Sequence, residues 1–148
     1  MYDTLLVATD GSADSESAIA HAIELAVSMD ATLHAVSVVE TRTAYDNAII
    51  DPTEVRENLR SDAHEALERA KTAAADAGLS CDTTLSEGPP PDRILTVAEE
   101  VGADVIVVGA TGRSGFKRLV LGGTAERLLE SASIPVIVIG GASTPTLD

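Results

Sequence analysis

The sequence predicts an α/β fold, with a parallel β-sheet and helices on its faces. Strand-like and helix-like segments alternate along the chain, which is the order expected when helices connect parallel strands. The strand-like segments, such as residues 105–108, are short and apolar throughout, as is typical of strands buried on both faces. A chain of 148 residues with 45% hydrophobic content can bury one core, so we expect one domain.

The first predicted element is a buried strand at residues 4–9, which ends at the turn Asp10-Gly11-Ser12. Residues 14–29 are predicted to be helical, because small and apolar residues recur there at three- and four-residue steps. Ser12 or Asp14 is available as the N-cap of this helix. The second strand is residues 32–39. Residues 40–50 show no clear period, so they predict a long loop.

A long helix is predicted to begin at Pro52. Asp51 supplies an N-cap, proline suits the first helical position, and Glu54 suits the third. Apolar and alanine residues then recur every three or four positions as far as Ala77. Gly78 can close the helix in a left-handed conformation.

The C-terminal half begins with a third strand at residues 80–85. Residues 87–91 are Glu-Gly-Pro-Pro-Pro and predict a rigid turn, because proline cannot donate to a strand ladder. A short helix at residues 92–101 is expected to end at Gly102. Residues 104–109 are the most strand-like of the chain and should be central in the sheet. A helix at 124–131 and a strand at 135–139 complete the fold.

Charge argues against nucleic acid and membrane partners. The 24 acidic and 10 basic residues give a net charge of −14, which would repel nucleic-acid backbones and anionic membranes. Two lysines and three aromatic residues fit adaptation to high salt, but they also fit an ordinary acidic soluble protein. No apolar run approaches the ~20 residues of a membrane span, and nothing resembles a signal peptide, so we expect a cytoplasmic protein.

Cys81 and the histidines are predicted to have no chemical role. A single cysteine excludes an internal disulfide and fits a reducing compartment, and Cys81 is expected to be a packed side chain. His21, His34 and His64 are scattered without metal-ligand spacing, so we assign none of them to a site.

A glycine-rich motif connects the fourth predicted strand to the last helix. It reads Gly109-Ala110-Thr111-Gly112, nine further residues, and then Gly122-Gly123-Thr124. Glycines let the backbone amides approach one anion, and a helix N-terminus favours phosphate. Arg113, Lys117 and Arg118 lie inside the motif. We therefore predict phosphate binding, with a tight strand-to-helix turn as the alternative.

This motif resembles the ATP-binding signature of the universal stress protein family. Residues 5–12 resemble the family's opening strand and Asp-Gly-Ser turn, residues 37–40 resemble the end of its second strand, and residues 103–139 resemble its C-terminal half. The resemblance implies a family domain at residues 1–140, and the polar residues 141–148 are expected to form a flexible C-terminal tail.

The resemblance also implies a fold and a site. The fold is a single open parallel five-stranded sheet of order 3-2-1-4-5, with helices on both faces, like that of adenine-nucleotide alpha hydrolases. Strands one and four then meet where open α/β sheets bind ligands. The implied ligand is ATP or AMP with magnesium. Asp10 would lie near the ribose or a nucleotide-bound magnesium ion, and Val38 would pack on the adenine. The implied binding residues are Ala8, Thr9, Asp10, Val38, Val108, Gly109, Thr111, Gly112, Arg113, Gly122, Gly123 and Thr124.

One departure from the family pattern leaves the ligand open. The family has Ser or Thr directly after the last motif glycine, whereas Gly123 stands here and the hydroxyl follows at Thr124. ATP, AMP and no nucleotide therefore all remain possible. Asp10 itself could serve as a turn or capping residue as well as a ligand contact.

Three functions follow from these observations. The leading one is a regulatory, stress-response module that binds ATP and hydrolyses it slowly at most, because no general base, arginine finger or Walker lysine is evident. A ligand-free interaction module is the second. A small adenylating enzyme is the third, since residues 10–15 loosely resemble the pyrophosphate-binding loop of ATP-dependent ligases. The apolar residues 134–139 would form a sheet edge, so we also predict a homodimer through them, as the resemblance implies.

Overall fold

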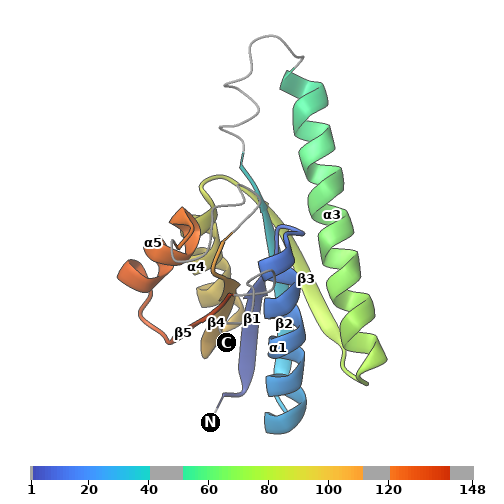
Figure 1. The fold of residues 1–148 in the computed structure, drawn as a ribbon, viewed down its shortest axis with the longest axis vertical. Helices are drawn as coiled ribbons and strands as arrows, with labels where there is room; N and C mark the ends of the chain where they lie inside the picture. The colour runs from blue at the N-terminus through green and yellow to red at the C-terminus, as the bar shows by residue number, and fades with distance from the viewer. Residues whose placement is uncertain (1, 41–51, 112–120, 141–148) are drawn as a thin grey trace, which may run out of the picture.

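The structure, a computed structural model, describes residues 2–40, 52–111 and 121–140. Figure 1 shows five strands in one parallel sheet of order β3-β2-β1-β4-β5, which confirms the predicted fold class. The strands are β1 (Thr4–Ala8), β2 (Thr32–Val39), β3 (Cys81–Glu87), β4 (Val105–Gly109) and β5 (Val136–Ile139). The helices are α1 (Ala13–Met29), α3 (Pro52–Asp76), α4 (Pro90–Val101) and α5 (Gly123–Ser131).

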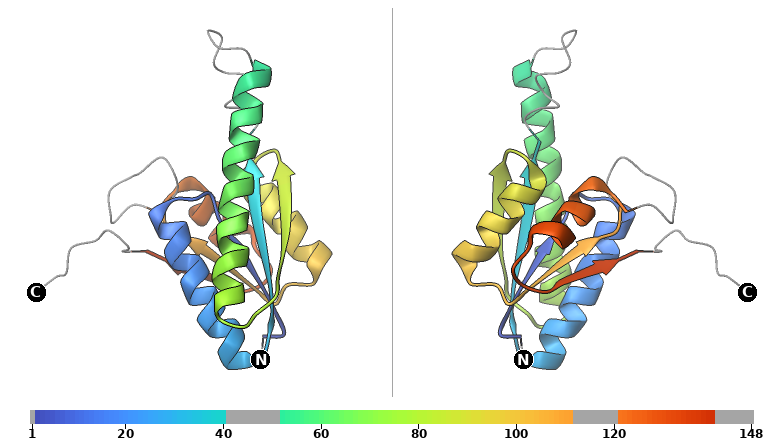
Figure 2. Two further views of the ribbon diagram at one scale, coloured as in Figure 1. Left: turned by 90° about the vertical axis from the view of Figure 1, so that its right-hand side faces the viewer. Right: turned by 90° about the vertical axis from the view of Figure 1, so that its left-hand side faces the viewer.

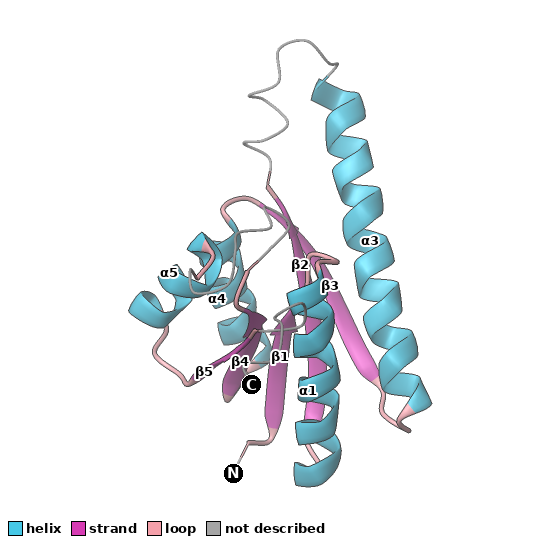
Figure 3. Ribbon diagram, in the orientation of Figure 1, coloured by secondary structure: helices cyan, strands magenta, loops and turns pink. Residues whose placement is uncertain are grey.

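The helices form one layer on each face of the sheet (Figures 2 and 3). Successive residues of β1 point to opposite faces, so Leu5 and Val7 pack with α1 and α3, whereas Leu6 packs with α4 and α5. Each face therefore has its own core, and β1 is fully buried from Leu5 to Val7. This burial on both faces explains why the strands are apolar throughout.

The strand order reverses beside β1. Leu5 pairs with Leu33 of β2 on one side and with Val105 of β4 on the other. Because the strands are parallel, their carboxyl ends lie along one edge of the sheet. The connections leave β1 and β4 in opposite directions at that edge, and such a switch point leaves a crevice between them.

Local signals place the helix ends. Ser12 is the N-cap of α1, and its side chain accepts a hydrogen bond from the amide of Ser15, which decides between the two predicted caps. Gly78, at φ 81°, follows α3. Gly102, at φ 69°, is the C-cap of α4. The left-handed conformation was predicted for Gly78, and Gly102 was predicted as a helix end; glycine adopts this conformation without a steric penalty.

The prediction of a rigid turn at residues 87–91 is wrong in part. Glu87 ends β3, where it pairs with Val39, and Pro90 and Pro91 form the first turn of α4 with Pro89 as N-cap. Proline is tolerated there because first-turn amides have no partner within the helix. Residues 41–50 of the predicted loop, the cap at Asp51 and the tail at 141–148 lie outside the described residues. None of the helices in the described ranges is both long and apolar enough to traverse a bilayer.

Candidate functional site

A cavity of about 410 Å³ opens at the carboxyl ends of β1, β2 and β4, where the strand order reverses. Ten of the twelve predicted site residues line it: Ala8, Thr9, Asp10, Val38, Val108, Gly109, Thr111, Gly122, Gly123 and Thr124. The other two, Gly112 and Arg113, lie outside the described residues, as do Lys117 and Arg118. The fold thus brings together residues from three separate parts of the sequence.

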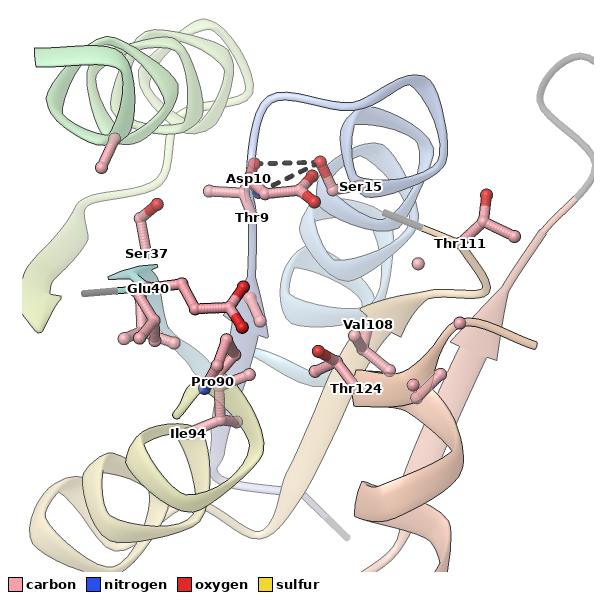
Figure 4. A pocket seen from close by; sticks show the side chains of 18 of the residues that line it. Thr9, Asp10, Ser15, Ser37, Glu40, Pro90, Ile94, Val108, Thr111 and Thr124 are labelled. Atoms are coloured by element: carbon pink, nitrogen blue, oxygen red, sulfur yellow. Dashed lines mark hydrogen bonds between the residues drawn. The ribbon is translucent and has the colours of Figure 1, made fainter. Parts of the chain in front are cut away.

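One end of the cavity has apolar walls. Val36 and Val38 of β2 line it together with side chains from two helices, and two polar side chains, Ser37 and Glu40, lie beside them. The helical side chains are Leu59 and Ala63 of α3 and Pro90 and Ile94 of α4. Figure 4 shows Pro90 and Ile94 below the end of β2. The sequence prediction missed these helical residues, because helical periodicity identifies an apolar face but not the part of the sheet that it covers. Such walls suit a flat, weakly polar group.

The β1–α1 turn is held by a small hydrogen-bond network (Figure 4). The Ser15 hydroxyl donates to the carbonyl of Ser12 at 3.0 Å. In the 3.2 Å contact between the Ser15 and Thr9 hydroxyls, Thr9 must therefore be the donor. Thr9 Oγ1 and Ser15 Oγ also accept bonds from the amides of Gly11 and Asp10. Both hydroxyl hydrogens are used within the turn, so they fix its shape.

Asp10 combines a turn role with a place in the cavity. Its Oδ1 accepts a hydrogen bond from the amide of Ser12 at 2.9 Å, the arrangement by which aspartate stabilises a turn. The residue is also half-buried and lines the cavity. The two roles considered for Asp10 from the sequence are therefore compatible.

Asp14 is a buried residue that the sequence analysis considered only as a cap. It is the second residue of α1, and its Oδ2 accepts hydrogen bonds from the amide of Thr111 at 3.1 Å and the hydroxyl of Thr111 at 2.7 Å. No sequence motif signals this contact, because 97 residues separate the partners. The bonds attach the end of β4 to the start of α1.

Gly109 allows the same close approach. A Cβ atom on Gly109 would lie 2.8 Å from the backbone carbonyl carbon of Asp14 and 2.8 Å from the amide nitrogen of Ser15. The missing side chain therefore lets α1 pack directly on β4, in addition to placing the Gly109 backbone at the cavity.

The start of α5 forms the other polar wall. Its N-cap, Gly122, makes no side-chain cap bond, and the Gly122 amide donates to the carbonyl of Ala110 at 2.7 Å. Gly123 and Thr124 follow and line the cavity. A helix N-terminus with uncapped amides attracts anions. A Cβ on Gly123 would contact nothing within 4 Å, so this position has space for a side chain.

The charged side chains among the described lining residues are both acidic. They are Asp10 and Glu40, and Figure 4 shows the Glu40 carboxylate pointing into the cavity. Oxygen donors of this kind suit a hard cation such as magnesium. Within residues 2–40, 52–111 and 121–140, no cluster of three or more His, Cys, Asp or Glu could by itself hold a metal ion.

Cys81 lies away from the cavity in the core between the sheet and helices α1 and α3. Burial, followed by the nearby charge of Asp82, raises the pKa of its thiol to about 11. The predicted packing of this side chain is confirmed, because Cys81 is free and buried.

Comparisons with known proteins place this geometry in a family. The model of the universal stress protein family matches residues 1–140. A universal stress protein of Methanocaldococcus jannaschii is 36% identical over 140 residues, which cover 94% of this chain and 82% of that protein. The solved structure of UspA from Lactobacillus plantarum superposes with a TM-score of 0.82 at 30% identity, over 93% of this chain and 97% of that one. A universal stress protein of Archaeoglobus fulgidus in complex with dAMP superposes with a TM-score of 0.68 at 25% identity, over 93% and 98% of the two chains.

Proposed function

The chain belongs to the universal stress protein family, and on this premise we propose that its cavity binds an adenine nucleotide, with ATP and magnesium as the expected ligand. One observation carries the proposal. The cavity joins an apolar end, built by β2, α3 and α4, to the uncapped N-terminus of α5. This combination suits a ligand with a flat base at one end and phosphates at the other. The structure with dAMP in the Archaeoglobus fulgidus relative supports the choice of an adenine nucleotide.

The lining residues suggest how the ligand lies. The base packs against Val38 among the apolar side chains, and the phosphates lie toward Gly122–Thr124. A volume of about 410 Å³ is within the roughly 300–1,000 Å³ of small-molecule sites. The carboxylates of Asp10 and Glu40 would repel a bare triphosphate, but they fit one that carries magnesium, and we propose Asp10 as the candidate ligand of that ion. Magnesium would neutralise phosphate charge when bound.

We propose a regulatory binding module rather than an efficient enzyme. The described residues that line the cavity include no lysine, arginine or histidine, so none of them supplies the cationic groups on which phosphoryl transfer depends. We assign no catalytic residue. Occupancy of the cavity would instead alter the position of α3 and α4, whose side chains line it.

Released nucleotide tests this function. The freshly purified protein is incubated with excess ATP and magnesium, desalted and denatured, and the supernatant is analysed for adenine nucleotide by chromatography. Val38→Asp places a charge at the apolar end and should abolish retention. Val27→Asp is the matched control, because Val27 lies on α1 and is 53% exposed. Absence of nucleotide from all three proteins would favour the ligand-free interaction module.

We also infer that two copies pair through β5. This edge strand carries four half-buried apolar residues, Val136–Ile139, and Ile134 beside it is half-buried too. Exposed apolar edges favour pairing. Sedimentation at micromolar concentration and high salt should show a dimer, and Ile137→Lys should give a folded monomer by circular dichroism. A wild-type species of only ~15 kDa, the mass of one chain, would refute this inference.

The proposal includes a cytoplasmic location and adaptation to salt. The buried thiol of Cys81 fits a reducing compartment. The net charge of −14 makes self-repulsion strong at low ionic strength and weak at high ionic strength. Unfolding midpoints that rise steadily with potassium chloride concentration would support adaptation to salt, and midpoints independent of salt would oppose it.

A further inference from the structure

Asp14 and Thr111 form a buried contact beside the cavity. Asp14 is 8% exposed and does not line the cavity, whereas Gly109, Ala110 and Thr111 do. Both polar hydrogens that Thr111 offers, from its amide and its hydroxyl, are donated to one oxygen of Asp14. Thr111 was predicted to contact phosphate, but in this arrangement its donors are already used.

The contact extends to the start of α5. Ala110, the neighbour of Thr111, donates its amide to the carbonyl of Ile139 at 2.7 Å and accepts a bond from the amide of Gly122 at 2.7 Å. Gly122 is the N-cap of α5. Residues 110 and 111 therefore connect the first turn of α1 to β5 and to the start of α5 through backbone and side-chain hydrogen bonds.

The two helix N-termini beside the cavity differ. In α1 the cap position is filled by Ser12, and the carboxylate of Asp14 lies in the first turn, where it interacts favourably with the helix dipole. The N-cap of α5 makes no side-chain bond, and the acidic residue of its first turn, Glu126, is exposed and does not line the cavity. A phosphate would therefore be repelled from α1 and attracted to α5.

We propose that Asp14 is a positioning residue, which acts through Thr111 to hold the phosphate end of the cavity and so sets the preference for phosphorylated over unphosphorylated ligands. This inference rests on the proposed nucleotide-binding function. It makes Thr111 a support for the site rather than a phosphate ligand.

The variants separate position from charge. Since a single Asp14 oxygen accepts both bonds, Asp14→Asn can keep both and lose only the charge, whereas Asp14→Ala loses both. Thr111→Val removes the hydroxyl and keeps the amide, and Thr111→Ser restores the hydroxyl. Glu16→Ala is the matched control, because Glu16 lies in the same turn of α1 and faces Arg69 at 3.6 Å instead of the cavity. Circular dichroism and the unfolding midpoint establish that each variant is folded.

Each variant is titrated with ATP and magnesium, and separately with adenosine. We expect Asp14→Ala to weaken ATP binding by about tenfold or more, as when two hydrogen bonds that order a loop are removed, and to change adenosine binding by less than about twofold. Thr111→Val should lower the ratio of ATP affinity to adenosine affinity to a smaller extent. Thr111→Ser, which keeps a hydroxyl, should leave this ratio at the wild-type value. Glu16→Ala should bind both ligands with wild-type affinity. Asp14→Asn should bind ATP as tightly as the wild type or more tightly.

The outcomes distinguish this inference from the function on which it rests. Suppose that the wild type binds both ligands, and that Asp14→Ala either weakens the binding of both ligands equally or weakens the binding of neither. The positioning role is then refuted and nucleotide binding stands. If Asp14→Asn is as impaired for ATP as Asp14→Ala, the charge rather than the position matters, and the inference is also refuted. If the wild type binds neither ligand, both proposals are refuted.

Discussion

Substitution of Gly109 by alanine tests the packing of α1 on β4. The added Cβ would lie 2.8 Å from two backbone atoms, the carbonyl carbon of Asp14 and the amide nitrogen of Ser15, whereas ordinary contact begins at 3.4 Å. Neither atom is the end of a flexible side chain, so the first turn of α1 must move. Gly109 is not one of the glycines with positive φ in the described part of the chain. Alanine therefore brings no backbone strain, and the steric clash alone determines the loss of unfolding free energy.

Overpacking of this kind costs about 1–3 kcal/mol of unfolding free energy. For a domain of this size, the cost corresponds to a fall of roughly 3–10 °C in the unfolding midpoint. The same movement would displace Asp14 from Thr111, so ATP affinity should fall as well.

Thermal unfolding by circular dichroism in molar salt measures this effect. Gly123→Ala is the matched control, because its Cβ would contact nothing within 4 Å, and alanine at the start of a helix should be neutral or slightly stabilising. A Gly109→Ala protein as stable as the wild type, or less destabilised than Gly123→Ala, would refute the packing argument.

Three further predictions concern other parts of the molecule. Gly123→Ser should leave ATP affinity unchanged or raise it, since the added side chain has space, and Gly112→Val should abolish binding; calorimetry measures both. The Cys81 thiol has a pKa raised from 9.0 to about 11. The free energy of unfolding should therefore be intact below pH 9 and decline as pH rises through about 11. Urea titrations at each pH measure this decline, and Cys81→Ala should remove it. Glu87→Gln should lower the free energy of unfolding by less than about 1 kcal/mol, because the two arginines that Glu87 contacts are 47% and 49% exposed. A greater loss, measured by urea unfolding at molar salt, would show that these ion pairs contribute more than exposed pairs do.

Much of the fold could be predicted because its signals are local. The burial of β1 and β4 on both faces requires continuous apolar runs, and the left-handed helix ends require residues such as Gly102. The error at Pro90 and Pro91 has a physical origin. Proline is disfavoured in the interior of a sheet and of a helix, but it is accepted in the first turn of a helix. The sequence alone therefore did not distinguish a turn from a helix start.

The site could be predicted where residues lie at or after the carboxyl end of a strand, or at the start of a helix. Asp10 and Gly122 were identified on that basis with the help of the family resemblance, and the fold brings them to one cavity. Leu59 and Ile94 were not, because the crossing of α3 and α4 over the sheet depends on tertiary packing. Asp14 was missed as a site residue because its partner is distant in the sequence and its short side chain equally suits a cap.

Calorimetric titration of the nucleotide-free protein with ATP and magnesium in molar salt measures whether this cavity binds a nucleotide. We expect saturable binding of one ATP per chain, weaker binding when magnesium is omitted, and loss of binding in Val38→Asp. The absence of a saturable signal for ATP and for AMP, with the protein folded by circular dichroism, would contradict the proposal that this cavity is a nucleotide site.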